Sequence, residues 1–177
     1  MATASRFARC NVLLLLTLSA IPADADTQSR PFGPGTAVGA TVQWIGTDDE
    51  VIEAPAVALH VTSIRRSGLA FDFGLATLPM ALADGELILA PDISIAGVIP
   101  IWGGGLFLKG GPSFILLEGG TAGALMGAHL GAGLFVRTGK GFGIRAEVIP
   151  RVYAAPMVGG FVVTTYGIGL TSLPRRP

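Results

Sequence analysis

The sequence has 177 residues, of which 50% are hydrophobic and only 14% are charged, whereas an ordinary soluble domain has about 25% charged residues. Lys and Arg together number 12, as do Asp and Glu, so the net charge is zero and the basic excess of a nucleic-acid-binding protein is absent. The apolar composition favours a membrane protein, but 26 glycines, each costing about 1 kcal/mol inside a helix, favour a curved sheet over packed helices.

Residues 1–25 have the layout of a secretory signal peptide. Two arginines precede an apolar run over residues 11–21, which is too short to span a membrane as a helix. The small-x-small pattern at Ala23-Asp24-Ala25 then marks a cleavage site. We therefore predict that the mature chain begins at Asp26 and contains no cysteine, because Cys10 is the only one in the sequence.

Residues 34–174 are predicted to form a β-barrel domain, between a polar lead-in over 26–33 and a short tail over 175–177. Turn signals divide this domain into about eight segments of roughly ten residues, a length that suits tilted transmembrane strands. In chain order the segments cover 38–45, 54–64, 69–77, 87–95, 105–117, 128–137, 142–153 and 161–173. We interpret Gly110-Gly111-Pro112, inside the fifth segment, as a bulge.

Side chains alternate along these segments with the period of two that a strand imposes. The clearest case is 142–153, where Arg145, Glu147 and Arg151 share one face and the opposite face is wholly apolar. Three further polar residues fall on the corresponding faces of other segments: Asp72, Asp92 and His129. Apolar residues outside and small or polar residues inside are the arrangement of a barrel in lipid, and such a sheet must close. The aromatic residues Trp44, Tyr153 and Tyr166 are predicted to form a girdle on the outer face.

The charged face predicts an ion-pair network inside the barrel. A charged Arg facing lipid would cost about 2–4 kcal/mol near the bilayer midplane, so these charges must point inward. Unpaired buried charges are strongly unfavourable, so we expect Arg145 or Arg151 to pair with Asp72, Asp92 or Glu147. Such a network would plug the lumen. The alternative is that the same charges line an ion path.

The C-terminal part carries a resemblance to a known group of proteins. Residues 127–153, GAHLGAGLFVRTGKGFGIRAEVIPRVY, and 166–174, YGIGLTSLP, resemble the final hairpins of small bacterial outer-membrane β-barrel proteins of the OmpA-transmembrane-like and OmpX-like families. Late strands of these families often carry an inward Arg-x-Glu pair and end in a Gly-x-Gly-Leu-type strand. The resemblance implies a closed antiparallel barrel in the bacterial outer membrane, in contact with membrane lipid and with the outer-membrane assembly machinery. It carries over no catalytic motif.

A helical inner-membrane protein is the rival architecture. Residues 119–136 are apolar and long enough to span a bilayer as a helix, and they contain two overlapping Gly-x-x-x-Gly motifs. A second apolar stretch covers 93–108. Pro100 and Gly103-Gly104-Gly105 within that stretch favour a turn over a helix.

The two histidines, His60 and His129, are the candidates for catalysis or metal binding. No Gly-x-Ser-x-Gly or His-x-Ser signature accompanies them, and two distant histidines fall short of a metal-ligand set. We therefore predict no catalytic, cofactor-binding or metal site. The sequence favours a monomeric barrel of about eight strands, filled by its own side chains, with a structural, adhesive or accessory role at the cell envelope. A barrel-embedded lipid-modifying enzyme and a narrow pore remain alternatives.

Overall fold

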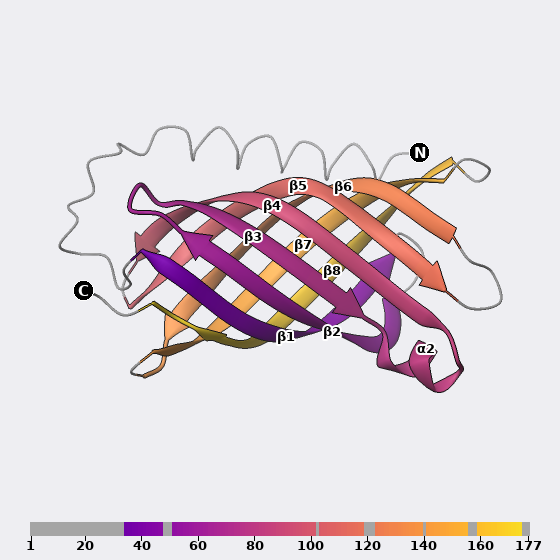
Figure 1. Ribbon diagram of the computed structural model, residues 1–177, viewed down its shortest axis with the longest axis horizontal. Coiled ribbons are helices and arrows are strands. Elements are labelled where there is room, and N and C mark those ends of the chain that lie inside the picture. Colours follow the sequence, from indigo (N-terminus) through magenta and orange to yellow (C-terminus); the bar gives the residue numbers. More distant parts are fainter. Residues whose placement is uncertain are drawn as a thin grey trace.

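The computed structural model describes residues 34–47, 51–101, 103–118, 123–139, 141–155 and 159–174. These residues form a closed antiparallel barrel in which each strand pairs with the next in the sequence and β8 pairs with β1 (Figure 1). The elements are β1 (Gly35–Thr47), β2 (Val51–Ile64), β3 (Leu69–Thr77), α2 (Pro79–Ala83), β4 (Leu87–Ile101), β5 (Gly104–Glu118), β6 (Gly123–Arg137), β7 (Phe142–Ala155) and β8 (Gly159–Ser172). The all-β, eight-stranded fold predicted from the sequence is confirmed. The predicted signal peptide, residues 1–25, the lead-in and the tail lie outside the described residues.

The rival helical architecture is wrong. Residues 123–136 of its main apolar segment belong to β6, and its second apolar stretch is divided between β4 and β5. Glycines on the inward face of β6 explain the difference, since Gly127 and Gly133 let the neighbouring β7 backbone approach closely. None of the helices in the part of the chain that the structure describes is long and apolar enough to cross a membrane.

The structure differs from the predicted strands in two details, one at the turn between β4 and β5 and one within β5. Of the residues expected to favour a turn, Gly103 forms one, and its φ of 65° suits a left-handed turn position. Pro100 lies instead within β4, opposite Gly105 of β5. The predicted bulge at Gly110-Gly111-Pro112 is also wrong, because the register between β5 and β6 is unbroken through these residues. A Cβ on Gly111 would lie 2.0 Å from the Ile93 carbonyl oxygen, so this glycine permits close strand approach. The register shift lies between β1 and β2, after Gln43.

The outer wall of the barrel is apolar. Large aliphatic side chains from several strands are more than half exposed, among them Val38 (54%), Leu59 (57%), Ile95 (59%) and Leu170 (64%). Trp44 and Tyr166 also face outward, side by side across the β1–β8 pairing. Tyr153 does not join them, because it has the same parity as Arg151 and is buried inside, stacked on Phe161. Its place in the predicted girdle is therefore wrong.

The topology gives the barrel two different ends. We call the end where β1 begins and β8 ends the terminal end; it carries the turns after β2, β4 and β6. The connections after β1, β3, β5 and β7 lie at the opposite, loop end, where α2 sits between β3 and β4 (Figure 1). The turns at the terminal end are tight, with glycines at positive φ: Gly68, Gly103 and Gly141.

Candidate functional site: the charged lumen

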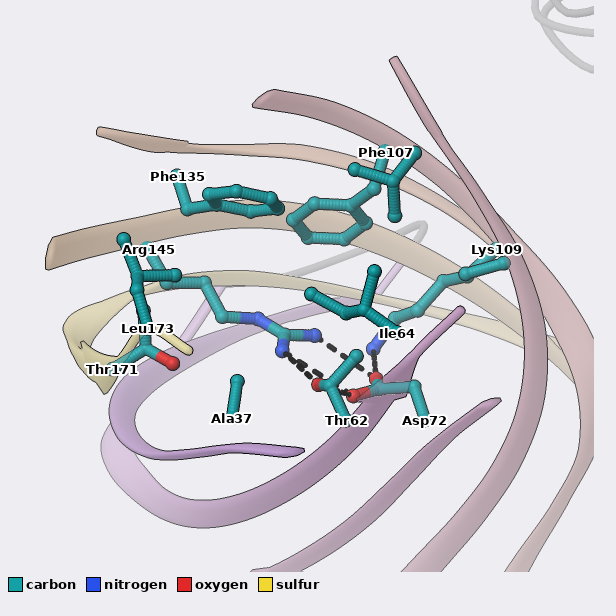
Figure 2. A pocket seen from close by; sticks show the side chains of 12 residues that line it. Ala37, Thr62, Ile64, Asp72, Phe107, Lys109, Phe135, Arg145, Thr171 and Leu173 are labelled. Carbon is teal, nitrogen blue, oxygen red and sulfur yellow. Dashed lines mark hydrogen bonds and ion pairs between the residues drawn. The ribbon is translucent and has the colours of Figure 1, made fainter. Parts of the chain in front are cut away.

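The lumen is filled in layers, of which the one nearest the terminal end is apolar. Its side chains pack as a single cluster of Ile64, Ala70, Ala96, Val98, Phe107, Phe135 and Leu173. The Phe107 and Phe135 rings stack with centroids 6.2 Å apart. Figure 2 shows these rings beside Arg145, whose guanidinium carbon lies 4.7 Å from the Phe107 centroid. The cluster therefore forms an apolar floor beneath the charged residues.

The next layer is a closed ring of four charges, which we call the first cluster: Asp72, Lys109, Arg145 and Glu147. Arg145 Nη2 lies 2.9 Å from Asp72 Oδ2 and 2.8 Å from Glu147 Oε2. Lys109 Nζ bridges the same two carboxylates, at 2.8 Å from Asp72 and 3.2 Å from Glu147. Each acid thus touches both bases. All four residues are at most 5% exposed, and their formal charges cancel.

Polar side chains of β1 and β2 complete this cluster. The second Glu147 oxygen lies 3.1 Å from His60 Nε2 and accepts a hydrogen bond of 3.3 Å from Gln43 Nε2. Thr62 donates to Asp72 and accepts from Arg145 Nη1 at 3.1 Å. A buried ion pair is stabilising only when its remaining hydrogen-bonding positions are satisfied, and these contacts supply that condition.

The third layer, nearer the loop end, is the second cluster. Its ion pair joins Arg151 to Asp92, with Arg151 Nε 3.1 Å from Asp92 Oδ2. Ser113 Oγ donates to Asp92 Oδ1 at 2.5 Å and lies 2.8 Å from His129 Nδ1. Ser94 Oγ lies 2.7 Å from the other ring nitrogen of His129. One acid and one base again cancel, and the imidazole is held between two hydroxyl groups.

The second cluster contains serine, histidine and aspartate, the residue types of a nucleophilic triad. Ser94 and His129 are at the distance that a nucleophile and its base require. However, Ser113 lies between His129 and Asp92, whose closest nitrogen and oxygen are 3.8 Å apart. Ser94 is also only 2% exposed, which leaves its hydroxyl no face open to a substrate. The arrangement is a buried hydrogen-bond network. Among the described residues, no group of three or more His, Cys, Asp or Glu side chains is placed to hold a metal ion.

The six residues singled out from the sequence all lie in the lumen. Asp72, Arg145 and Glu147 belong to the first cluster, and Asp92, His129 and Arg151 to the second. Sequence reasoning missed Lys109, which lies in the Gly-rich stretch where alternation is weakest. A lone lysine inside an apolar segment was the available signal, because a lysine facing lipid would be costly.

Little space remains between the apolar layer and the first cluster. The cavity lined by Thr62, Asp72, Phe107, Lys109 and Arg145 has a volume of about 20 Å³ (Figure 2). A cavity of that size holds about one water molecule. The side chains themselves therefore fill this part of the lumen.

Comparison with known proteins identifies the fold. No family model matches the chain, and no curated protein matches its sequence. Solved structures do match. Neisserial surface protein A has a TM-score of 0.58 at 10% identity, over 78% of this chain and 95% of that one. The Pseudomonas aeruginosa outer membrane protein OprG has a TM-score of 0.54 at 11% identity, over 85% and 100%. Ail, the attachment invasion locus protein of Yersinia pestis, has a TM-score of 0.52 at 12% identity, over 77% and 95%. The small-barrel fold implied by the C-terminal resemblance is confirmed.

Proposed function

We propose that the chain is a bacterial outer-membrane protein that spans the membrane as a monomeric barrel closed by its own lumen side chains. Its role at the cell envelope is structural, adhesive or accessory. After export and cleavage behind Ala25, the chain is inserted by the outer-membrane assembly machinery. The fold is shared with a protein named as an outer membrane protein and with an attachment protein, which supports both the location and the class of role.

The outer wall supports the membrane location. Exposed large hydrophobic side chains occur on all eight strands, whereas a soluble monomer rarely exposes an apolar patch larger than a few hundred Å². Among the strand residues whose side chains are described, the charged ones are buried in the lumen, apart from Glu118 and Arg137 at the ends of β5 and β6. A barrel with this polarity is stable in hydrocarbon, because closure leaves no strand edge with unsatisfied backbone groups.

Leu59→Arg should prevent stable insertion. Leu59 is 57% exposed in the central part of β2, and an Arg facing lipid near the midplane costs about 2–4 kcal/mol. The folded fraction in phosphatidylcholine vesicles, measured by urea titration, should fall for Leu59→Arg and stay unchanged for Met80→Arg. Met80 is equally open, at 62% exposed, but lies in α2 beyond the strands. Equal loss in the two variants would mean that the outer wall does not face lipid.

The lumen supports a barrel that does not conduct. The single observation that carries this proposal is the first cluster, in which two acids and two bases are mutually paired above an apolar layer. An ion entering the lumen would have to break these pairs and displace Phe107 and Phe135.

The expected result in planar bilayers is therefore no discrete conductance from the inserted parent chain. Insertion is verified independently by resistance of the barrel to protease added from both sides. Stepwise currents from the parent that change in size with Lys109→Gln would show that the charges line an ion path, and would overturn the closed-lumen proposal.

A further inference from the structure

The charges outside the lumen are sorted between the two ends of the barrel. In the described residues whose side chains are placed, the basic ones outside the two lumen clusters are Arg65, Arg66 and Arg137, and the acidic ones are Asp84, Glu86 and Glu118. Arg137 has the inward parity of Phe135 and donates to the Pro174 carbonyl oxygen at 3.3 Å. The three arginines lie at the terminal end and the three acids at the loop end. We call Arg65 and Arg66, which lie in the turn after β2, the terminal rim, and the three acids the loop rim. The net charge of zero therefore conceals a strong polarity along the barrel axis.

The other charged connections, judged from their sequence, follow the same distribution of acidic and basic residues between the two ends. Asp48, Asp49 and Glu50 occur between β1 and β2, a connection of the loop-end class. Lys140 occurs between β6 and β7, a connection of the terminal class. Acidic residues gather at the loop end and basic residues at the terminal end, each in more than one connection. A single charged loop would not produce this distribution.

Arg65 is held at the edge of the apolar outer wall. Its guanidinium carbon lies 5.2 Å from the centroid of the Phe71 ring, and Phe71 is 42% exposed on the outward face of β3. The backbone beneath it is fixed, because Gly68 N donates to Arg65 O at 3.0 Å and Arg65 N donates to Leu69 O at 2.8 Å. A cation on the outer wall, just beyond the last apolar residues, lies at the level of lipid headgroups.

We propose that the terminal rim binds the phosphates of anionic phospholipids in the leaflet that surrounds it, with Arg65 as the primary contact. The inference rests on the proposed membrane location. A guanidinium binds phosphate oxygens through two parallel hydrogen bonds, and its planar group remains stacked on Phe71 while it does so. The loop rim has the opposite sign and repels the same headgroups. The two leaflets therefore interact differently with the two ends.

Native mass spectrometry of the full refolded chain tests this proposal. The chain is presented with phosphatidylglycerol or phosphatidylcholine of identical acyl chains, and the retained lipid is counted. Each arginine near an anionic headgroup increases the preference for phosphatidylglycerol over phosphatidylcholine about fivefold. The double variant Arg65→Gln/Arg66→Gln should therefore reduce phosphatidylglycerol retention by at least about fivefold. Asp84→Asn/Glu86→Gln, which neutralises two charges at the other end, is the matched control and should not reduce it.

Three results would overturn the proposal: equal retention of the two lipids by the parent, equal loss in the loop-rim control, or displacement of the lipid by an equal concentration of inorganic phosphate. The last result would mean that the rim recognises a free anion and not a headgroup on the lipid-facing wall. Failure of the proposed membrane location is distinguishable, since the chain would then not insert into pure phosphatidylcholine vesicles at all.

Discussion

Glu147→Ala is expected to lower the free energy of unfolding by about 3–5 kcal/mol, the usual result of removing one member of a buried ion pair. The Glu147 carboxylate contacts Lys109, Arg145, His60 and Gln43 within 3.3 Å. Without it, two buried bases share Asp72 alone, and the first cluster changes from neutral to a net charge of about +1. Urea titration of the barrel in detergent, followed by far-UV circular dichroism, measures the loss.

Two comparisons separate charge pairing from packing. Glu86→Ala removes an exposed acid on the loop rim and should change stability by less than about 0.5 kcal/mol. Lys109→Met/Glu147→Met removes one acid and one base together, so it should cost less than Glu147→Ala alone. If Glu147→Ala unfolds at the same urea concentration as the parent, the paired-lumen hypothesis is wrong.

Gly169→Ala is expected to destabilise the barrel by about 3 kcal/mol or more, at the upper end of overpacking effects. Gly169 lies in β8 opposite Thr41 of β1, within the pairing that closes the barrel. A Cβ at this position would lie 1.9 Å from the Ala40 carbonyl oxygen and 2.5 Å from the Thr41 Cα. Both are backbone atoms, so the two strands themselves must separate.

Gly97→Ala provides the matched control for this substitution. Gly97 also lies within a strand, β4, but it faces outward and a Cβ there would meet no atom within 4 Å. The control should retain the parent's unfolding midpoint and β-type circular dichroism. Equal destabilisation by the two substitutions would mean that the close approach of β8 to β1 is not the cause of the loss, since Gly→Ala by itself lowers the entropy of the unfolded chain and does not destabilise the fold.

The strands and the direction of their side chains could be predicted from the sequence, because a period of two is a local property. Arg145, Glu147 and Arg151 reveal the inward face of β7 without knowledge of any other strand. The same alternation correctly places Tyr153 inside the barrel, whereas the expectation that Tyr153 belongs to an outer aromatic girdle was wrong.

The partners within the lumen could not be predicted in the same way. Arg145 reaches Asp72, which is on a strand that is not its neighbour, while Arg151 reaches Asp92. Which acid meets which base depends on how far each strand is displaced along the axis, and this displacement accumulates around the whole barrel. The alternation of side chains identifies which charged residues point into the lumen. It does not give the position of each residue along the barrel axis, or the side of the lumen from which its side chain extends.

The pairing of the first strand with the last constrains the order in which the barrel can form. The backbone amide of Val38 donates to the Ser172 hydroxyl, a contact between residues separated by 134 positions. Contacts of such long range form slowly, because the entropy of closing the intervening chain must be lost first. Until β8 arrives, β1 and β7 present open edges that hydrocarbon cannot tolerate. Stable insertion therefore cannot proceed strand by strand as the chain emerges, and it must await the C-terminal strand.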